Sequence, residues 1–437
     1  MSRLALAADA APTLVVRTLR LPPDVDPLAL LRALPDEHRF FWERAAAGEA
    51  IAAVGAALVV RGTGTRRFAA VAAEQRRLPA AAVLLGGFAF DAAHVPAGPW
   101  RGFAAAEWVV PRLAVVRRRG SARLVAAALD AAGGPGPELD EMLARGRAAL
   151  ACRDTAPPPG SAPARYRVLG LTSPRRWRDA VEAARADVAA GRLEKVVLAR
   201  ACAVEANAPF DPLGVVAALR RAYPGATVFA VGRGAATFLG ATPERLAAVY
   251  DDRLVTAAVA GTAARGTTVV ADRALARALA TSDKERHEHA LVVDDLLRRL
   301  APLCRALAAA PAPRVVPAAS VQHLCTQVTG RLEPGVGLLD VVAALHPTPA
   351  VCGTPRAAAL AALTGREDVP RGWYTGGVGW IGSRGGEVAV ALRTALVEGR
   401  RALLHAGAGI VAGSRWEAEL EETRLKMRPL LGALLEP

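Results

Sequence analysis

Three lysines stand apart in a chain that otherwise uses arginine as its basic residue. Lys195, Lys284 and Lys426 are the only lysines among 55 basic residues in a chain of 437. Arginine keeps its proton at any physiological pH, whereas a desolvated lysine can lose one, so only lysine can serve as a general base. Lys195 precedes an apolar run that predicts a buried strand. Its position favours a role in proton transfer. The alternative, that a lysine arose at this position by chance, explains this single residue equally well.

A predicted helix that begins at Ser282 carries the first candidate metal ligands. Glu285 and Glu288 are three residues apart, and this spacing places two side chains on one face of a helix. Carboxylate oxygens are the ligands that Mg²⁺ prefers. A capping box, in which Glu285 binds the amide of Ser282, is the competing interpretation for Glu285. Glu288 has no such structural role.

A second predicted helix, after Ser414, repeats the pattern. Glu419 and Glu422 are again three apart, and Lys426 lies one turn beyond Glu422. If the two helices face each other, their four carboxylates form an oxygen-rich magnesium site, although surface pairs with this spacing are common. The glycine-rich string 407–413 before this helix predicts a turn whose free backbone amides receive an anion.

Arg393 lies in a segment, 374–410, that predicts a meander of three strands. Alternation along 387–397 places Arg393 on one face with Ala389, Ala391 and Ala395. A guanidinium above such a floor can hold a carboxylate bidentately. An arginine at a solvent-facing edge is the alternative.

The elements that must position these residues follow a proline-rich segment at 153–165. Ser173 and Pro174 predict a helix start and Gly191 its end, with a strand beginning near Lys195. Residues 227–261 predict strands and turns, including a turn at 251–252.

Composition limits the classes of function. The net charge of +14 suggests a nucleic-acid-binding protein, but the arginines are scattered and only four tyrosines are available for stacking. The sequence shows no apolar run long enough to cross a membrane and no signal peptide, which predicts a cytoplasmic location. Five widely spaced cysteines indicate reduced core residues. The charge suits a small dianionic substrate.

Several strings together resemble the chorismate-utilising enzymes, the family of isochorismate, salicylate, anthranilate and aminodeoxychorismate synthases. They follow the family order and span roughly residues 165–430. The strings are Lys195–Arg200, Phe238–Leu246, Ala260–Thr262, Ser282–Asp295, His323–Thr326, Leu345–Ala350, Arg371–Gly377, Arg393 and His405–Ile410.

The resemblance implies specific roles for two residues. Lys195 would take a proton from the water that attacks C2 of chorismate, while Glu244 would protonate the departing C4 hydroxyl. Members that use water have lysine at the position of Lys195, whereas amine-transferring members typically have glutamine there. Aminodeoxychorismate synthases have a nucleophilic lysine where this chain has Ala260. Both positions imply water as the nucleophile.

The same resemblance implies the remaining site residues. Mg²⁺ would be held by Glu288 and Glu422, with Glu285 and Glu419 close by or bridging through water. The implied substrate contacts are Gly261, Thr262, His323, Tyr374, Arg393, Gly407, Ala408, Gly409 and Lys426.

The expected fold is α/β (α+β), similar to anthranilate synthase component I, with layered, mostly antiparallel sheets and flanking helices. Residues 1–152 would form its N-terminal part and 166–437 its chorismate-binding catalytic region, with 153–165 as a linker or surface crossing. The expected activity is that of an Mg²⁺-dependent isochorismate synthase of menaquinone or siderophore type that needs no amidotransferase subunit. The N-terminal strings Phe40–Arg44 and Gly86–Asp91 favour it over salicylate synthase, the nearest alternative.

Overall fold

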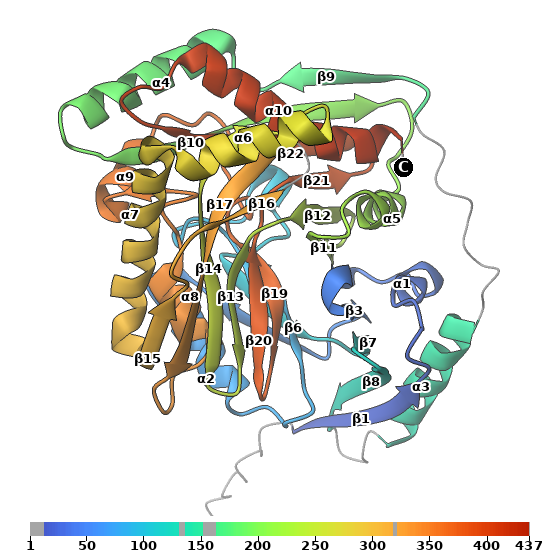
Figure 1. Ribbon diagram of the computed structural model, residues 1–437. Helices are drawn as coiled ribbons and strands as arrows, with labels where there is room; N and C mark the ends of the chain where they lie inside the picture. The colour runs from blue at the N-terminus through green and yellow to red at the C-terminus, as the bar shows by residue number, and fades with distance from the viewer. Residues whose placement is uncertain (1–12, 131–135, 152–162, 318–320, 437) are drawn as a thin grey trace, which may run out of the picture.

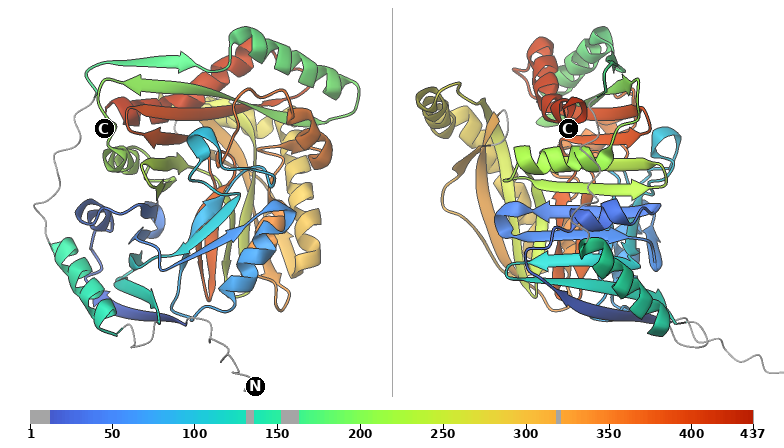
Figure 2. Two further views of the ribbon diagram at one scale, coloured as in Figure 1. Left: turned by 180° about the vertical axis from the view of Figure 1, so that it is seen from behind. Right: turned by 90° about the vertical axis from the view of Figure 1, so that its right-hand side faces the viewer.

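Two antiparallel sheets pack face to face, and helices cover their outer surfaces (Figure 1). The computed structural model describes residues 13–130, 136–151, 163–317 and 321–436. The strands of the two sheets cross at a steep angle, as Figures 1 and 2 show. In such packing, the chain passes between sheets at corners. These corners position the site described below.

The first sheet contains twelve strands. In spatial order they are β1 (Leu14–Leu21), β8 (Ser121–Leu129), β7 (Leu113–Arg118), β3 (Glu49–Val54), β2 (His38–Arg44), β11 (Thr227–Arg233), β12 (Ala236–Thr242), β21 (Thr394–Glu398), β22 (Arg401–Ile410), β10 (Lys195–Ala206) and β18 (Gly353–Thr354), with β9 (Tyr166–Gly170) also paired to β10.

The second sheet contains ten strands. In order they are β15 (Cys304–Ala309), β17 (Val321–Leu332), β14 (Arg253–Ala264), β13 (Arg245–Tyr250), β20 (Gly385–Val390), β19 (Gly377–Gly382), β5 (Leu84–Phe88), β6 (Ala106–Val110) and β4 (Leu58–Gly62), with β16 (Arg314–Pro317) paired to β17. Strands from before and after residues 153–165 lie side by side in both sheets, so neither part of the chain has a sheet of its own. Most of the 153–165 segment lies outside the described residues.

The helices lie on the outer faces of the two sheets and at one end of the first sheet. They are α1 (Leu28–Ala33), α2 (Arg67–Gln75), α3 (Gly136–Ala151), α4 (Pro174–Ala189), α5 (Pro212–Ala222), α6 (Val269–Thr281), α7 (Asp283–Leu300), α8 (Leu338–Leu345), α9 (Arg356–Leu363) and α10 (Trp416–Leu435). Helices α1, α3 and α5 pack on the first sheet, and α2, α7 and α8 pack on the second. Helices α4, α9 and α10 enclose the end formed by β10 and β22.

Both faces of most central strands are buried, and β2 shows how. Phe40 and Trp42 point between the sheets, whereas Phe41 points toward the helices, as the two-residue period of a strand requires. Burial of one such side chain contributes roughly 1.5–3 kcal/mol. The layer between the sheets combines aliphatic residues with eight aromatic ones: Phe40, Trp42, Trp100, Phe103, Phe229, Phe238, Trp373 and Trp380.

The local predictions around β10 are confirmed. Ser173 caps α4 by accepting a hydrogen bond from the backbone N–H of Arg176, and Gly191 adopts a positive φ of 70° after the helix ends. Strand β10 then begins at Lys195. The predicted turn at 251–252 connects β13 to β14.

The predicted three-strand meander over 374–410 is wrong. The segment forms four strands, and the expected single strand over 387–397 is broken between β20 in the second sheet and β21 in the first. Arg393 lies in this break with φ of 51°, a left-handed backbone conformation. Side-chain alternation continues on both sides of the break, so periodicity alone could not locate it.

None of the described helices is long and apolar enough to cross a membrane. Among the cysteines in the described residues, Cys202, Cys304, Cys325 and Cys352 are all free, and three of them are buried. This agrees with the prediction of reduced cysteines, while Cys152 lies outside the described residues.

Candidate active site

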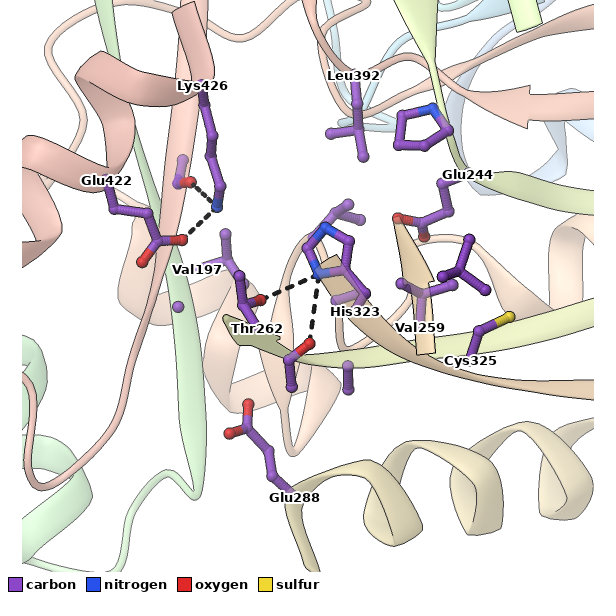
Figure 3. A pocket seen from close by; sticks show the side chains of 18 of the residues that line it. Val197, Glu244, Val259, Thr262, Glu288, His323, Cys325, Leu392, Glu422 and Lys426 are labelled. Atoms are coloured by element: carbon purple, nitrogen blue, oxygen red, sulfur yellow. Dashed lines mark hydrogen bonds and ion pairs between the residues drawn. The ribbon is translucent and has the colours of Figure 1, made fainter. Parts of the chain in front are cut away.

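One cavity of about 650 Å³ brings the predicted site residues together. It lies where the two sheets meet, between α7 and α10 (Figure 3). All of the predicted site residues line it except Ala408. The lining members are Lys195, Glu244, Gly261, Thr262, Glu285, Glu288, His323, Tyr374, Arg393, Gly407, Gly409, Glu419, Glu422 and Lys426.

Two neighbouring corners between the sheets carry Glu244 and Arg393. Glu244 lies between β12 of the first sheet and β13 of the second, and Arg393 lies on the return path from β20 to β21. The corners are hydrogen-bonded to each other: the Val390 N–H donates to the Glu244 carbonyl at 3.0 Å, and the Ala241 N–H donates to the Arg393 carbonyl at 3.2 Å. The backbone segments that carry Glu244 and Arg393 are therefore fixed next to each other.

The environment of Glu244 favours its protonated form. Burial raises the pKa of Glu244 to about 7, although Arg393, Lys426 and Lys195 act to lower it. A carboxyl group with this pKa can carry and deliver a proton near neutral pH. Glu244 can therefore hold a proton near neutral pH, while its role as general acid stays a prediction.

Lys195 reaches the cavity from the first position of β10. Its Nζ forms an ion pair with Glu288 Oε1 at 2.6 Å. The side chain crosses Gly409 of the neighbouring strand so closely that a Cβ at position 409 would lie 2.6 Å from Lys195 Cε. The absence of a side chain at Gly409 thus sets the path of Lys195.

The predicted free turn at 407–413 is wrong in its first half. Gly407, Ala408 and Gly409 belong to β22 and pair with Ala199, Leu198 and Val197 of β10. Ala408 is fully buried among residues that face α4, away from the cavity. These glycines make room for other groups rather than presenting an open nest of amides, because strand pairing uses part of their backbone.

A bulge in β14 forms the opposite wall. Gly261 has a φ of 75°, and the pairing of β14 with β17 shifts there by one residue. The Thr262 N–H consequently donates to Glu285 Oε2 at 3.2 Å. Ser282 Oγ accepts from the Glu285 N–H as a helix cap, while the Glu285 carboxylate itself bonds to Thr262. The capping-box alternative therefore holds for Ser282 and does not describe the Glu285 side chain.

His323 faces Thr262 across the strands in the centre of the view in Figure 3. Its Nδ1 lies 3.3 Å from the Gly261 carbonyl and 3.1 Å from Thr262 Oγ1. Since a carbonyl can only accept, we assign the ring proton to Nδ1. Burial, with the charges of Arg393 and Lys426, lowers the pKa of His323 to about 4, so the ring is neutral and Nε2 can accept a hydrogen bond.

Cationic and phenolic groups gather beside Glu244. Lys426 Nζ contacts Glu422 Oε1 at 2.5 Å and donates to the Gly407 carbonyl at 2.9 Å. The Tyr374 ring stacks on His405, with ring centroids 5.2 Å apart, and burial raises the pKa of Tyr374 to about 12. Tyr374 is thus a neutral hydrogen-bond donor near the charges of Arg371 and Arg393. This combination can bind carboxylates.

The four glutamates line the cavity from α7 and α10, as the spacing predicted. The Glu419 side chain is hydrogen-bonded to Ser414 and Glu422, and its pKa is raised by burial and by the charge of Glu422. Close carboxylates of this kind suit a hard cation. Within the described residues, no three His, Cys, Asp or Glu side chains are gathered tightly enough to hold a metal ion. Glu288 forms an ion pair with Lys195, and Glu422 forms one with Lys426. Carboxylate oxygens are the donor type that Mg²⁺ prefers, so these four residues fit that cation.

Sequence reasoning missed the apolar wall of the cavity. Val259, Cys325 and Leu392 lie on the side of Glu244, and Val197 lies beside Thr262 (Figure 3). Val197 could have been found, because it is two residues after Lys195 on the same face of β10. Leu392 could not have been found, because the predicted single strand over 387–397 placed it in the middle of a strand, whereas it lies in the break between β20 and β21.

Comparison with known proteins agrees with this geometry. Residues 2–435 match the family model described as chorismate binding enzyme. The "Salicylate biosynthesis isochorismate synthase" of Pseudomonas aeruginosa is 37% identical, over 97% of this chain and 90% of that protein. The solved structure of MenF, the menaquinone-specific isochorismate synthase from Escherichia coli, is 29% identical with a TM-score of 0.85, covering 97% of this chain and 95% of that chain.

A more distant structure tests the fold alone. Anthranilate synthase component I from Streptococcus pneumoniae is 20% identical with a TM-score of 0.66, covering 98% of this chain and 94% of that chain. The predicted α/β (α+β) fold, shared with anthranilate synthase component I, is therefore confirmed. Because the family model matches residues 2–435 and the Pseudomonas aeruginosa relative is 37% identical over 97% of this chain, the chain belongs to the chorismate binding enzyme family.

Proposed function

We propose that this protein is an isochorismate synthase that isomerises chorismate by adding water at C2 and removing the C4 hydroxyl. One observation carries the proposal: Lys195 and Glu244, whose pKa is raised to about 7, line the same cavity. A base that activates water and an acid that protonates a leaving hydroxyl are what this displacement needs. Two of the three relatives named above, those from Pseudomonas aeruginosa and Escherichia coli, are isochorismate synthases by name and support it.

The residues divide the reaction as follows. Lys195 takes a proton from water as its oxygen attacks C2, the two ring double bonds shift, and Glu244 protonates the C4 oxygen, which leaves as water. Water is gained and lost, so the net change is an isomerisation. Lys195 has to leave Glu288 before it can approach the water, because its Nζ lies 2.6 Å from Glu288 Oε1.

Tyr374, Arg393 and Lys426 bind the two carboxylates of the dianionic substrate. The ring lies against Gly261, Thr262 and the apolar wall, and His323 accepts a hydrogen bond at Nε2. Glu288 and Glu422, with Glu285 and Glu419, are the residues that would hold Mg²⁺. When bound, the cation would neutralise these carboxylates and attract the ring carboxylate of chorismate.

The test is to incubate purified protein with chorismate and Mg²⁺ and to separate the products. Isochorismate is the expected main product. Salicylate with pyruvate as main products would instead identify a salicylate synthase, and anthranilate formed with added ammonia would identify an amine-transferring enzyme. Absence of any turnover, with tight and steeply salt-dependent DNA binding, would overturn the assignment in favour of a nucleic-acid-binding role.

A further inference from the structure

One edge of β10 lacks a continuous partner strand next to Lys195. Within the described part of the chain, strands pair with this edge only at Lys195–Val196, through β18, and at Cys202–Ala206, through β9. The backbone between these two short pairings carries Val197 and so forms part of the cavity wall. An edge of this kind exposes backbone groups that need other partners.

Two backbone contacts and two side chains fill the gap. The Val197 N–H donates to the Cys352 carbonyl at 2.8 Å, and the Leu171 N–H donates to the Ala201 carbonyl at 3.1 Å; the side chains are those of Glu367 and Arg371. The Ala199 N–H donates to Glu367 Oε1 at 2.8 Å, and Arg371 Nη2 donates to the Val197 carbonyl at 2.6 Å. Glu367 and Arg371 are also bonded to each other, with Arg371 Nη2 at 2.5 Å from Glu367 Oε1 and Nε at 2.9 Å from Oε2. A carboxylate and a guanidinium thus supply the acceptor and donor that an adjacent strand would have supplied.

Arg371 ties this edge to the segment that carries Tyr374. Its Nη1 donates to the Val351 carbonyl at 2.8 Å and to Thr375 Oγ1 at 3.2 Å, and its guanidinium lies 4.2 Å from the centre of the Phe90 ring. All of its donor atoms are engaged, and only 3% of its side chain is exposed. Neither Arg371 nor Glu367 lines the cavity.

We infer that Glu367 and Arg371 are positioning residues that fix the strand of Lys195 relative to Tyr374. The inference rests on the proposed function for Lys195. Near Lys195 this edge of β10 is also held by the short pairing with β18 and by the N–H groups of Glu194 and Val197, which donate to the Thr354 and Cys352 carbonyls at 2.8 Å. The pair adds the restraints on the Val197 carbonyl and the Ala199 N–H, whereas Tyr374 is also held by its stacking on His405. Loss of the pair should therefore affect the chemical step more than substrate binding.

The experiment compares Glu367→Gln and Arg371→Lys with Asp295→Asn. Asp295 and Arg299 on α7 also form an ion pair between residues four apart, with a contact of 2.5 Å. The Asp295 side chain is 5% exposed, and that of Glu367 is 12% exposed. Arg371→Lys keeps a cation beside Glu367 but loses the fork that reaches Val197 and Thr375. Both site variants should lower kcat about tenfold or more, with KM changed less than about threefold. Asp295→Asn should lower only the melting temperature.

Amide hydrogen exchange provides a readout that does not depend on the reaction. Exchange in the peptide that covers 196–201 should accelerate in Glu367→Gln and Arg371→Lys and stay at the wild-type rate in Asp295→Asn. Normal kcat in Arg371→Lys, or unchanged exchange in this peptide, would overturn the inference. If the wild-type protein makes no isochorismate, the proposed function fails, and the exchange data still decide whether the pair holds β10.

Discussion

Replacement of Gly409 by alanine tests whether the path of Lys195 controls catalysis. The added Cβ would lie 2.6 Å from Lys195 Cε and 3.3 Å from Nζ, whereas carbon atoms in contact are normally about 3.5–4.0 Å apart. The lysine end must therefore retreat by about 1 Å. The retreat costs little folding energy, because only the flexible end of a side chain moves.

A displacement of about 1 Å can lower a rate on the order of 10²-fold, which corresponds to about 2.7 kcal/mol in the activation free energy. We expect Gly409→Ala to lower kcat by this factor, measured as isochorismate formed from saturating chorismate. The melting temperature should stay the same or rise slightly, since alanine costs less conformational entropy than glycine in a strand.

Gly432→Ala is the matched control. Gly432 lies on α10, and a Cβ added there meets no atom within 4 Å, so this variant should keep wild-type kcat. If Gly409→Ala turned over chorismate at a rate within about threefold of wild type, the close passage of Lys195 over Gly409 would have no catalytic importance. The backbone amide of residue 409 is retained in the variant, so a loss of activity would not reflect a missing anion contact.

Three further substitutions test the proposed roles. Because the pKa of Glu244 is raised from 4.5 to about 7, kcat/KM should fall as the pH rises through about 7. Glu244→Gln should remove most activity and, with it, this fall in the pH profile. A flat wild-type profile between pH 6 and 8 would argue against Glu244 as the acid. The raised pKa also means that the stabilisation from Glu244 is present below pH 4.5 and is lost as the pH rises through about 7, so Glu244→Gln should melt higher than wild type at pH 8, and an equal or lower melting temperature by calorimetry would contradict this. Lys195→Arg keeps the ion pair with Glu288 but removes the base, so turnover should disappear while the circular dichroism spectrum and melting temperature change little; a normal rate would exclude Lys195 from proton transfer. Glu288→Gln should raise the Mg²⁺ concentration needed for half-maximal activity, and an unchanged Mg²⁺ titration would place the cation elsewhere.

The sequence predicted the parts of the site that depend on local rules or on family strings. The spacing of Glu285 and Glu288 placed both on one face of a helix, and both line the cavity. Lys195 was singled out as a base by the chemistry of lysine in an arginine-rich chain, whereas Glu244 came from the resemblance, and both line the same cavity. Their roles stay predictions, while their convergence is a property of the fold.

The remaining features depend on contacts between distant segments. The Lys195–Glu288 ion pair joins residues 93 positions apart, and no local pattern encodes it. Gly407 and Gly409 were interpreted as turn residues because glycine favours turns, yet here they make room for Tyr374 and Lys195. The corner at Arg393 was missed since the two-residue period is the same before and after a change of sheet.

The interleaved sheets also dictate the order in which the protein can be completed during synthesis. Strand β2 pairs with β11, and β5 pairs with β19, so strands made early wait for partners that emerge almost 200 and 300 residues later. Until then their apolar edges are open to other chains, which is a known route to aggregation. The nascent first third of this protein should therefore be a client for chaperones, and fragments that end before β19 should be insoluble.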